Sequence, residues 1–319
     1  MADTLFTWGV TTVTDLITTT MENRDIKDVQ DAVFNKLATY EWLNRKKKLK
    51  RGGTSLTVPI RYQSNTPVGF YDGYDALTVT PAAELTAAQF KWKQAYGSIT
   101  VNGREDRIQN KGKHQVIDLV KQKMEGGEMA LRDMLNDALF AASPAAKDLA
   151  SLVTSIDATS SIGDINSTTY SFWQSRVTAS GSFASQGRAD MLTMWNNLAV
   201  RNGGGNPDLI LTTTDIHGFY EGSLTPMQRY ESRDTGDASF RDLMFKSTPV
   251  RFDAQATSGV MYFLNSEVID FSVDPDTDFH LTEWVKPANQ DAKVAQLLFA
   301  GELVVKNRRK LGKLTGITA

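Results

Sequence analysis

The chain has 319 residues, of which 41% are hydrophobic and 23% are charged, and these are ordinary values for a folded globular protein. Its 35 Lys and Arg against 37 Asp and Glu give a net charge of −2, which argues against a protein whose main task is to grip nucleic-acid phosphates. The absence of cysteine excludes disulfides, thiolate catalysis and cysteine-bound metal clusters. We expect no signal peptide and no membrane contact, because the start MADTLFTWGV lacks a basic and then apolar pattern and no stretch approaches ~20 apolar residues.

The first 51 residues predict an arm, a helix and a basic run. Residues 1–25 are Thr-rich and weakly apolar without a clear period, which indicates an N-terminal arm that packs on another surface. From Ile26 to Tyr40 apolar residues recur every three or four positions and predict a helix that ends near Asn44. The basic residues that follow are Arg45, Lys46, Lys47, Lys48, Lys50 and Arg51. They complement the dipole of the helix C-terminus or meet a neighbour's acidic surface, and contact with nucleic acid is the alternative.

Two strands joined by a long connection come next. Residues 56–62 alternate apolar and polar, which predicts a strand, and Pro59 places that strand at an edge. A second strand carries Phe90, Trp92 and Tyr96 on one face, and its phase shifts across Gly97 as a bulge would cause.

Residues 63–89 form the connection, which is far longer than a compact hairpin loop. Its tip carries the aromatic residues Phe70, Tyr71 and Tyr74. Aromatic side chains are enriched in protein interfaces, so we expect an arm that reaches a neighbouring molecule. A disordered surface loop is the alternative.

The rest of the chain mixes helices and strands. The longest helical pattern covers 113–142, stops at Ser143-Pro144, and is expected to bend at Gly126-Gly127. A helix is predicted at 189–201, a buried strand at 209–212 and a second helix capped by Thr214 or Asp215. Residues 225–241 predict a polar loop, and two longer strands at 279–286 and 293–305 precede a basic C-terminal exit at 306–310. The inward residues of the helix at 189–201 should be Met191, Leu192, Trp195, Leu198 and Ala199.

No pattern indicates a catalytic, cofactor or metal site. The three histidines, His114, His217 and His280, lie on different elements and lack a metal-ligand spacing. Asp274 to Asp278 begins like an EF-hand loop, but Phe279 stands where Gly is needed and Val285 where Glu is needed, so a turn is favoured. Gly203 to Gly205 lacks the residues of a phosphate loop, and no GxSxG elbow is present. We therefore expect a protein that is not an enzyme.

The order of these parts resembles the Hong Kong-type major capsid proteins of tailed phages. The resemblance covers nearly the whole chain and is carried by LTVPIRY, FKWKQAYGSITVNGREDRIQN, NPDLILTTTDIHGFY and GVMYFLNSEVIDFSV. It implies an α+β fold with an N-arm, an extended β-hairpin loop, a peripheral domain with a long spine helix, and an axial domain. The implied segments are 1–51 for the arm and first helix, 52–103 for the extended loop, 104–146 and 266–306 for the peripheral domain, and 147–265 and 307–319 for the axial domain.

The resemblance also implies a function. The subunit would assemble as hexamers and pentamers into the icosahedral head of a tailed phage, in the host cytoplasm, and would enclose double-stranded DNA without sequence-specific binding. Met227, Arg229 and Tyr230 would contact other subunits at the capsomer centre, and separate scaffolding, portal and decoration proteins are candidate partners. An encapsulin-like nanocompartment shell and a soluble α+β hydrolase are the alternatives.

Two features depart from some members of that family. Some members weld their shells by an isopeptide bond from a Lys on the extended loop, and no Lys occurs here between Tyr62 and Phe90. Some also carry an N-terminal scaffolding region, whereas this chain reaches its first predicted helix by Ile26. The resemblance therefore implies a shell without that crosslink and a scaffold that is a separate protein.

Overall fold

The computed structural model of the protein describes residues 37–64, 68–77, 83–104, 119–201, 205–224 and 243–319. The predicted N-terminal arm, most of the first predicted helix, His114 and the polar loop at 225–241 lie outside these ranges, and so do Met227, Arg229 and Tyr230. The helices described are α2 (Ala38–Arg45), α3 (Leu119–Leu139), α4 (Leu152–Ser155), α5 (Arg188–Arg201) and α6 (Thr214–Ser223), with the short helical turns η2 (Ser171–Trp173), η3 (Phe183–Gly187) and η5 (Arg308–Lys310). The strands described are β1 (Lys48–Leu49), β2 (Ser55–Arg61), β3 (Leu85–Lys91), β4 (Lys93–Asn102), β5 (Ser161–Ile162), β6 (Ile165–Asn166), β7 (Arg176–Ala179), β8 (Leu209–Thr212), β9 (Leu243–Phe245), β10 (Thr248–Phe252), β11 (Met261–Leu264), β12 (Ile269–Val273), β13 (His280–Leu281), β14 (Ala292–Val305) and β15 (Gly312–Thr315).

The described residues fall into two compact units. The smaller unit contains residues 96–131 and 279–298, within the ranges that the structure describes, and the larger unit contains 35–95, 132–278 and 299–319. The division of the chain into an arm, an extended loop, a peripheral domain and an axial domain stays a prediction.

A mixed sheet forms the centre of the larger unit. In the described part of the chain its strand order is β7-β15-β11-β8-β10-β9, and β8 runs parallel to β10 and antiparallel to β11. All four residues of β8 are buried, which confirms the strand predicted from the apolar run at 209–212. Residues of α5 and α6 complete this core, among them Met191, Leu198 and Tyr220.

The helix predicted at 189–201 is confirmed as α5, but the predicted buried face was partly wrong. Leu192 is 41% exposed, whereas Met194 is 2% exposed and was missed. Met191, Met194 and Leu198 are buried in the core at spacings of three and four, and Trp195, also predicted to face inward, packs partly buried against the same core. For α6 the N-cap is Thr213 and not Thr214 or Asp215, and Asp215 lies in the first turn, where a negative charge favours the helix dipole.

In the smaller unit, α3 lies against β4. The predicted bend at Gly126-Gly127 is wrong, because α3 continues without interruption through both glycines. A Cβ on Gly127 would lie 3.0 Å from Cγ1 of Ile99, so the missing side chain lets the helix approach the strand closely. The strand predicted at 279–286 is reduced to β13, followed by a single bridge between Val285 and Val294.

The phase change in the second arm strand was predicted at the wrong residue. The strand breaks at Trp92, between β3 and β4, and not at Gly97. Ala88 and Phe90 are buried in β3, whereas the buried residues of β4 are Ile99 and Val101. Tyr96 therefore lies on the outer face of β4 and is 69% exposed.

A side chain from far along the sequence caps helix α2. The N-cap residue of α2, Leu37, makes no side-chain cap. Instead Oδ2 of Asp253 accepts hydrogen bonds from the backbone N and the Oγ1 of Thr39, at 3.0 and 2.8 Å. Its other oxygen accepts bonds from Nδ2 of Asn136 on α3 and from the backbone N of Gln255, at 3.1 and 3.0 Å. Asp253 is 1% exposed, so this carboxylate joins α2, α3 and the loop after β10 inside the larger unit.

We predict that Asp253→Asn destabilises the larger unit. Both of its carboxylate oxygens face donors, so an amide would place an N–H group against N–H groups and leave buried donors unpaired. The expected loss is roughly 2–4 kcal/mol, measured by denaturant unfolding. Asp276→Asn, at an exposed carboxylate 71% accessible, is the matched control and should be close to neutral. Equal midpoints for the two variants would contradict the capping role.

Candidate intersubunit contact surface

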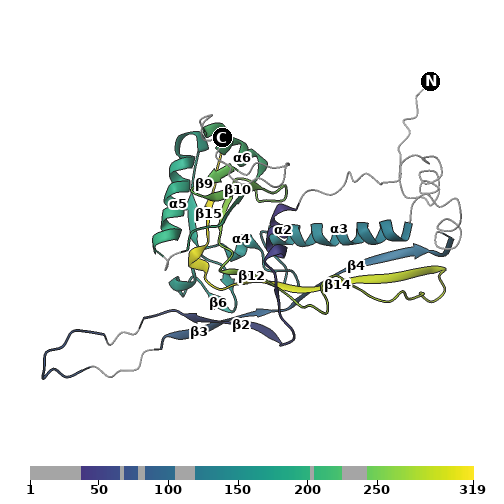
Figure 1. Ribbon diagram of the computed structural model, residues 1–319, viewed down its shortest axis with the longest axis horizontal. Helices are drawn as coiled ribbons and strands as arrows, with labels where there is room; N and C mark the ends of the chain where they lie inside the picture. Colours follow the sequence, from purple (N-terminus) through teal and green to yellow (C-terminus); the bar gives the residue numbers. More distant parts are fainter. Residues whose placement is uncertain (1–36, 65–67, 78–82, 105–118, 202–204, 225–242) are drawn as a thin grey trace. The chain divides into compact units, whose positions relative to one another are not determined.

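The arm formed by β2 and β3 has a fixed base. The two strands pair antiparallel from Ser55↔Lys91 to Arg61↔Leu85 (Figure 1), which confirms the predicted strand pair, but the connection ends before Leu85 and not at residue 89 as predicted. Four of its side chains are buried against Ile165, Trp173 and Val304 of the same unit. The four are Leu56, Val58, Ala88 and Phe90. Gln89 also donates its backbone N–H to the carbonyl of Gly163 at 3.0 Å, so both packing and hydrogen bonds fix the direction in which the arm leaves the unit.

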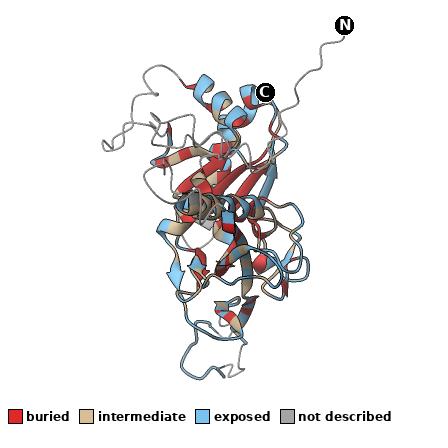
Figure 2. Ribbon diagram, turned by 90° about the vertical axis from the view of Figure 1, so that its right-hand side faces the viewer, coloured by how far each residue is buried: buried red, intermediate tan, exposed pale blue. Residues whose placement is uncertain are grey.

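The tip of the arm is exposed and aromatic. The exposed fraction is 110% for Phe70, 106% for Tyr74 and 67% for Tyr71. A turn shapes the tip, since Asp75 donates its backbone N–H to the carbonyl of Asp72 at 2.8 Å and Asp72 donates its own to Oδ2 of Asp75 at 2.9 Å. Figure 2 shows this loop in pale blue at the bottom of the view. A cluster of large, solvent-exposed apolar side chains indicates an interaction surface.

The basic run predicted as a contact surface has carboxylate partners within its own unit. Four of its six cations form ion pairs, and the residues of the run are Arg45, Lys46, Lys47, Lys48, Lys50 and Arg51. The nitrogen–oxygen distances are 2.9 Å for Lys46–Asp208, 2.8 Å for Lys48–Asp270 and 3.4 Å for Arg51–Asp276, and Lys47 pairs with Asp278. Arg45 lies in the last turn of α2, where a cation complements the helix dipole. Contact of this run with nucleic acid or with a neighbour stays a prediction.

Asp270 is the deepest of these carboxylates. It is 2% exposed and accepts two ion pairs, from Lys48 at 2.8 Å and from Lys306 at 2.6 Å. The hydrogen bond to Asp270 raises the pKa of Lys48, whereas burial lowers the pKa of Lys306. The three groups hold β1 beside β12, with which it pairs in parallel, and so fix the segment that leads into the arm.

The predicted basic exit at 306–310 contains a buried arginine. Arg308 is 0% exposed, and its guanidinium donates to the backbone carbonyls of residues 154, 155, 157 and 160 at 2.7–3.1 Å. Burial lowers the pKa of Arg308 to about 10, and the charge of Asp157 opposes that shift. The guanidinium thus organises the loop after α4 and contributes no charge to the surface.

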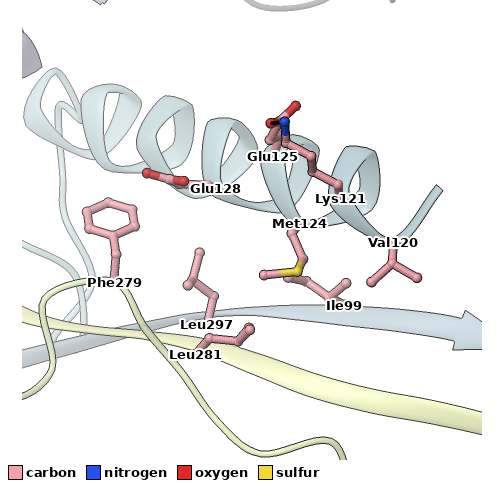
Figure 3. Close-up of a pocket in the computed structure, with 9 residues that line it drawn as sticks. All are labelled: Ile99, Val120, Lys121, Met124, Glu125, Glu128, Phe279, Leu281 and Leu297. Carbon is pink, nitrogen blue, oxygen red and sulfur yellow. Dashed lines mark ion pairs between the residues drawn. The ribbon is translucent and has the colours of Figure 1, made fainter. Parts of the chain in front are cut away.

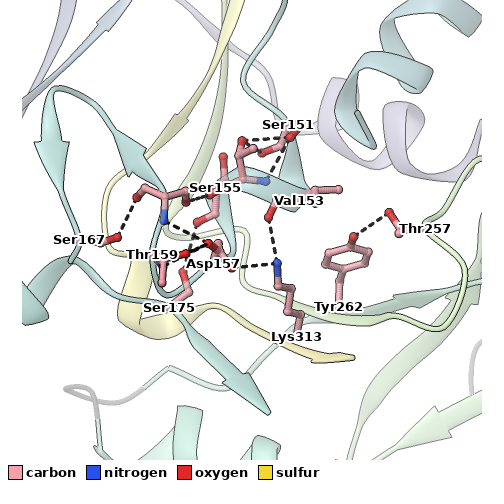
Figure 4. Close-up of polar contacts among 12 residues, drawn as sticks. Ser151, Val153, Ser155, Asp157, Thr159, Ser167, Ser175, Thr257, Tyr262 and Lys313 are labelled. Atoms are coloured by element: carbon pink, nitrogen blue, oxygen red, sulfur yellow. Dashed lines mark hydrogen bonds and ion pairs between the residues drawn. The ribbon is translucent and has the colours of Figure 1, made fainter. Parts of the chain in front are cut away.

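A second cation reaches the same loop (Figure 4). Nζ of Lys313 donates to the carbonyl of Val153 at 3.1 Å and lies 3.3 Å from Oδ1 of Asp157. Burial would raise the pKa of Asp157, but hydrogen bonds from Thr159 and the charge of Lys313 outweigh it, and the pKa is lowered. Lys313 and Asp157 therefore both have polar partners inside the unit.

The sites weighed in the sequence have ordinary places in the structure. The ring of His217 packs edge-on against Phe252 at 5.2 Å, and His280 is exposed on β13. Asp274 accepts hydrogen bonds from Thr277, as the predicted turn requires. Over the described ranges, no three His, Asp or Glu side chains converge as metal ligands. No described helix combines the length and the apolar character that crossing a membrane requires.

A cavity in the smaller unit was not foreseen from the sequence. This cavity has a volume of about 420 Å³ and lies beside the first turns of α3 (Figure 3). Val120 and Met124 lie on the apolar face of the predicted helix, yet both are only half-buried. The periodicity of the sequence predicts an apolar helix face but does not show that this face is incompletely covered. The residues that line the cavity are Ile99, Val120, Lys121, Met124, Glu125, Glu128, Phe279, Leu281 and Leu297.

Glu302 is the one described carboxyl whose pKa rises to about 7. It is 2% exposed on β14, and burial raises its pKa although Oε1 accepts backbone N–H bonds from Ala150 and Leu303, both at 2.8 Å. The pKa of this carboxyl is 4.5 in the unfolded chain and about 7 in the folded protein, so between these pH values the folded state holds a proton that the unfolded state has released. The contribution of Glu302 to the free energy of unfolding is therefore fully present below pH 4.5 and is lost as the pH rises through about 7.

We predict that Glu302→Gln removes this pH dependence. The wild-type chain should lose on the order of 3 kcal/mol through this group between pH values of about 4.5 and 8, and the variant should not. Unfolding in denaturant at both pH values measures the difference. Glu283→Gln, at an exposed carboxyl, is the control and should follow the wild type. Parallel pH profiles for the wild type and the Glu302→Gln variant would contradict the buried-carboxyl account.

The chain is similar in fold to chains of several solved phage and GTA capsids. The chain superposes on a chain of the cyanophage A-1(L) capsid asymmetric unit with a TM-score of 0.69 and 14% identity, covering 93% of this chain and 97% of that one. It superposes on a chain from the capsid of a native GTA particle with a TM-score of 0.61 and 10% identity, covering 91% and 95%. For the capsid of the myovirus XM1 the TM-score is 0.58 with 12% identity, covering 97% and 100%. No protein-family model matches the sequence, and no curated protein is similar to it in sequence.

Proposed function

We propose that this chain, which has the Hong Kong-type capsid fold along nearly its full length, is the major capsid protein of a tailed phage. Its role is structural: copies assemble as hexamers and pentamers into an icosahedral head in the virion. The observation that carries this proposal is the arm, because a tip with two fully exposed aromatic rings stands on a base that is packed and hydrogen-bonded. A soluble monomer would gain nothing from such a surface, whereas a subunit of a shell needs one.

The content of the shell belongs to the same proposal. The head encloses double-stranded DNA, and the wall does not bind it in a sequence-specific way. The net charge of −2 and the ion pairs of four cations of the basic run support a shell that does not bind DNA phosphates strongly. Scaffolding, portal and decoration proteins are separate partners in this proposal.

Expression of the chain followed by size-exclusion chromatography and electron microscopy tests the proposal. We expect closed particles, alone or with a co-expressed scaffold. Nucleic acid recovered from particles made during infection supports a phage head, and an enzyme recovered in its place indicates a nanocompartment. A persistent monomer of 35.3 kDa under all these conditions would end the shell hypothesis.

We predict that the triple variant Phe70→Ser, Tyr71→Ser and Tyr74→Ser leaves a folded subunit that forms no closed shells. The three rings are exposed in the subunit, so their loss costs it little stability, but it removes the largest anchors of the intersubunit contact. Thermal unfolding measures the first effect and electron microscopy the second.

The matched control is Val285→Ser, which removes an apolar side chain 64% exposed in the smaller unit. It should assemble like the wild type. Deletion of residues 65–80 should act like the triple variant. Normal particles from either arm variant would contradict the proposed role of the tip.

A further inference from the structure

The tip of the arm carries the dipeptide Asp72-Gly73 between two exposed tyrosines. We propose that Asp72 is a site of covalent modification, at which the backbone of the free subunit rearranges spontaneously to isoaspartate. The rearrangement follows from the local chemistry of the tip, whereas its effect on assembly rests on the proposed function. Three observations support the site: the reacting groups are free, a comparable pair elsewhere is blocked, and the product breaks the turn of the tip.

An aspartate that precedes a glycine forms a five-membered ring readily, because glycine has no side chain to hinder its backbone nitrogen. The nitrogen of Gly73 attacks Cγ of Asp72, the N–Cγ bond forms, and the hydroxyl of the protonated carboxyl leaves with the amide proton as one water molecule. A second water molecule then opens this succinimide ring. Cleavage of the bond from the nitrogen to the backbone carbonyl carbon gives isoaspartate, and cleavage of the N–Cγ bond restores aspartate.

The structure leaves both reacting groups of Asp72-Gly73 free. Both residues are exposed, and a Cβ added at Gly73 would meet no atom within 4 Å. The hydrogen bonds of the turn use other atoms: the backbone N–H of Asp72 donates to Oδ2 of Asp75 at 2.9 Å, and its carbonyl accepts from the backbone N–H of Asp75 at 2.8 Å. Within the described ranges, the carboxylate of Asp72 and the N–H of Gly73 have no hydrogen-bond partner.

A comparable pair, Asn102-Gly103, is blocked by the fold. The backbone N–H of Gly103 donates to the carbonyl of Asp291 at 2.8 Å, and Oδ1 of Asn102 accepts from the backbone N–H of Arg104 at 3.1 Å. Gly103 is buried, so ring closure would first leave a buried donor unpaired, and this lowers the reactive population about tenfold or more. The other Asn-Gly pair of the sequence, at 202–203, lies outside the described residues.

Isoaspartate at position 72 would break the turn that shapes the tip. The main chain of the product runs through Cβ and Cγ and is one atom longer, while the former backbone carbonyl becomes a free carboxylate. The carbonyl that accepts the N–H of Asp75 is thereby lost from the backbone. Tyr71 and Tyr74 lie on either side of the new linkage, so the spacing of their rings changes. Subunits that rearrange before assembly therefore lose the tip that the shell needs.

Peptide mapping of the free subunit tests the site. Trypsin cleaves after Arg61 and Lys91, so Asp72 lies in the peptide of residues 62–91 and Asn102 lies in another peptide. After prolonged incubation at one pH, chromatography separates the isomers of equal mass, and an isoaspartyl methyltransferase counts them by methyl transfer. We expect denaturant to raise the rate at Asn102 at least about tenfold and the rate at Asp72 less than about twofold. A rise at Asp72 as large as that at Asn102, or a peptide 62–91 without isoaspartate, would overturn the proposal.

The variant Gly73→Ala separates the chemistry from the fold. Its methyl group hinders the attacking nitrogen but has open space around it, so the tip keeps its conformation and isoaspartate should fall at least about tenfold. The matched control is Gly69→Ala, at a second glycine of the arm whose added Cβ also meets no atom within 4 Å, and it should rearrange like the wild type. Equal isoaspartate in the two variants would also decide against the site.

Assembly from an aged preparation tests the consequence. Isoaspartate at position 72 should be at least about tenfold more abundant in the unassembled fraction than in the particles, because an altered tip loses its anchors. Aged Gly73→Ala should assemble as well as the fresh variant. An equal isoaspartate content in both fractions would overturn the effect on assembly. Failure of the fresh wild-type chain to form any particle would instead contradict the proposed function, and the peptide maps would still decide whether Asp72 rearranges.

Discussion

The packing of the arm base against Trp173 and Val304 is the constraint on which the rest of the structure depends. A strand pair in isolation is marginally stable in water, so β2 and β3 need a surface that covers one of their faces. Leu56, Val58 and Phe90 supply the buried face, and the hairpin of β5 and β6 receives the backbone of β3 through Gly163. Because the base is fixed in this way, the direction in which β2 and β3 leave the unit is defined, and the entropy of ordering the base is lost on folding and not on assembly.

Buried charged groups also hold segments of the larger unit in place. Asp253 caps α2 from 214 residues away, and Asp270 holds β1 through Lys48. Arg308 donates to four carbonyls, two at the end of α4 and two in the loop after it. Each of these buried charged groups, Asp253, Asp270 and Arg308, is nearly inaccessible to water and is paired or hydrogen-bonded, as buried charges must be. Asp253 and Asp270 fix α2 and β1, which lead into the arm, and Arg308 fixes the end of α4 and the loop that leads to β5.

Much of the fold could be predicted from periodicity alone. The alternation at 56–62, the helical stripe at 189–201 and the apolar run at 209–212 each predicted the correct element, because each buries one face or both faces against a core.

The failures have physical causes. Trp92 and Gly97 both permit a change of strand phase, and only tertiary packing selects Trp92. Gly126 and Gly127 were interpreted as a bend, whereas the close approach of Ile99 requires a glycine inside a regular helix. The burial of Arg308 could not be predicted, because no local pattern reveals four carbonyls contributed by α4 and the loop after it, about 150 residues earlier. The exposed tip of the candidate site was visible in the sequence, but the cavity was not, since its lining comes from four separate elements and the segment before β13.

The rings of the tip are open to water in the subunit, and the proposed function requires another copy to cover them in the shell. Oxidative footprinting with mass spectrometry measures this directly at Phe70, Tyr71 and Tyr74, with Tyr96 as an exposed reference on β4. We predict that assembly lowers the oxidation rate of the tip residues at least tenfold relative to Tyr96. Equal oxidation of the tip in free subunits and in closed particles would contradict this account.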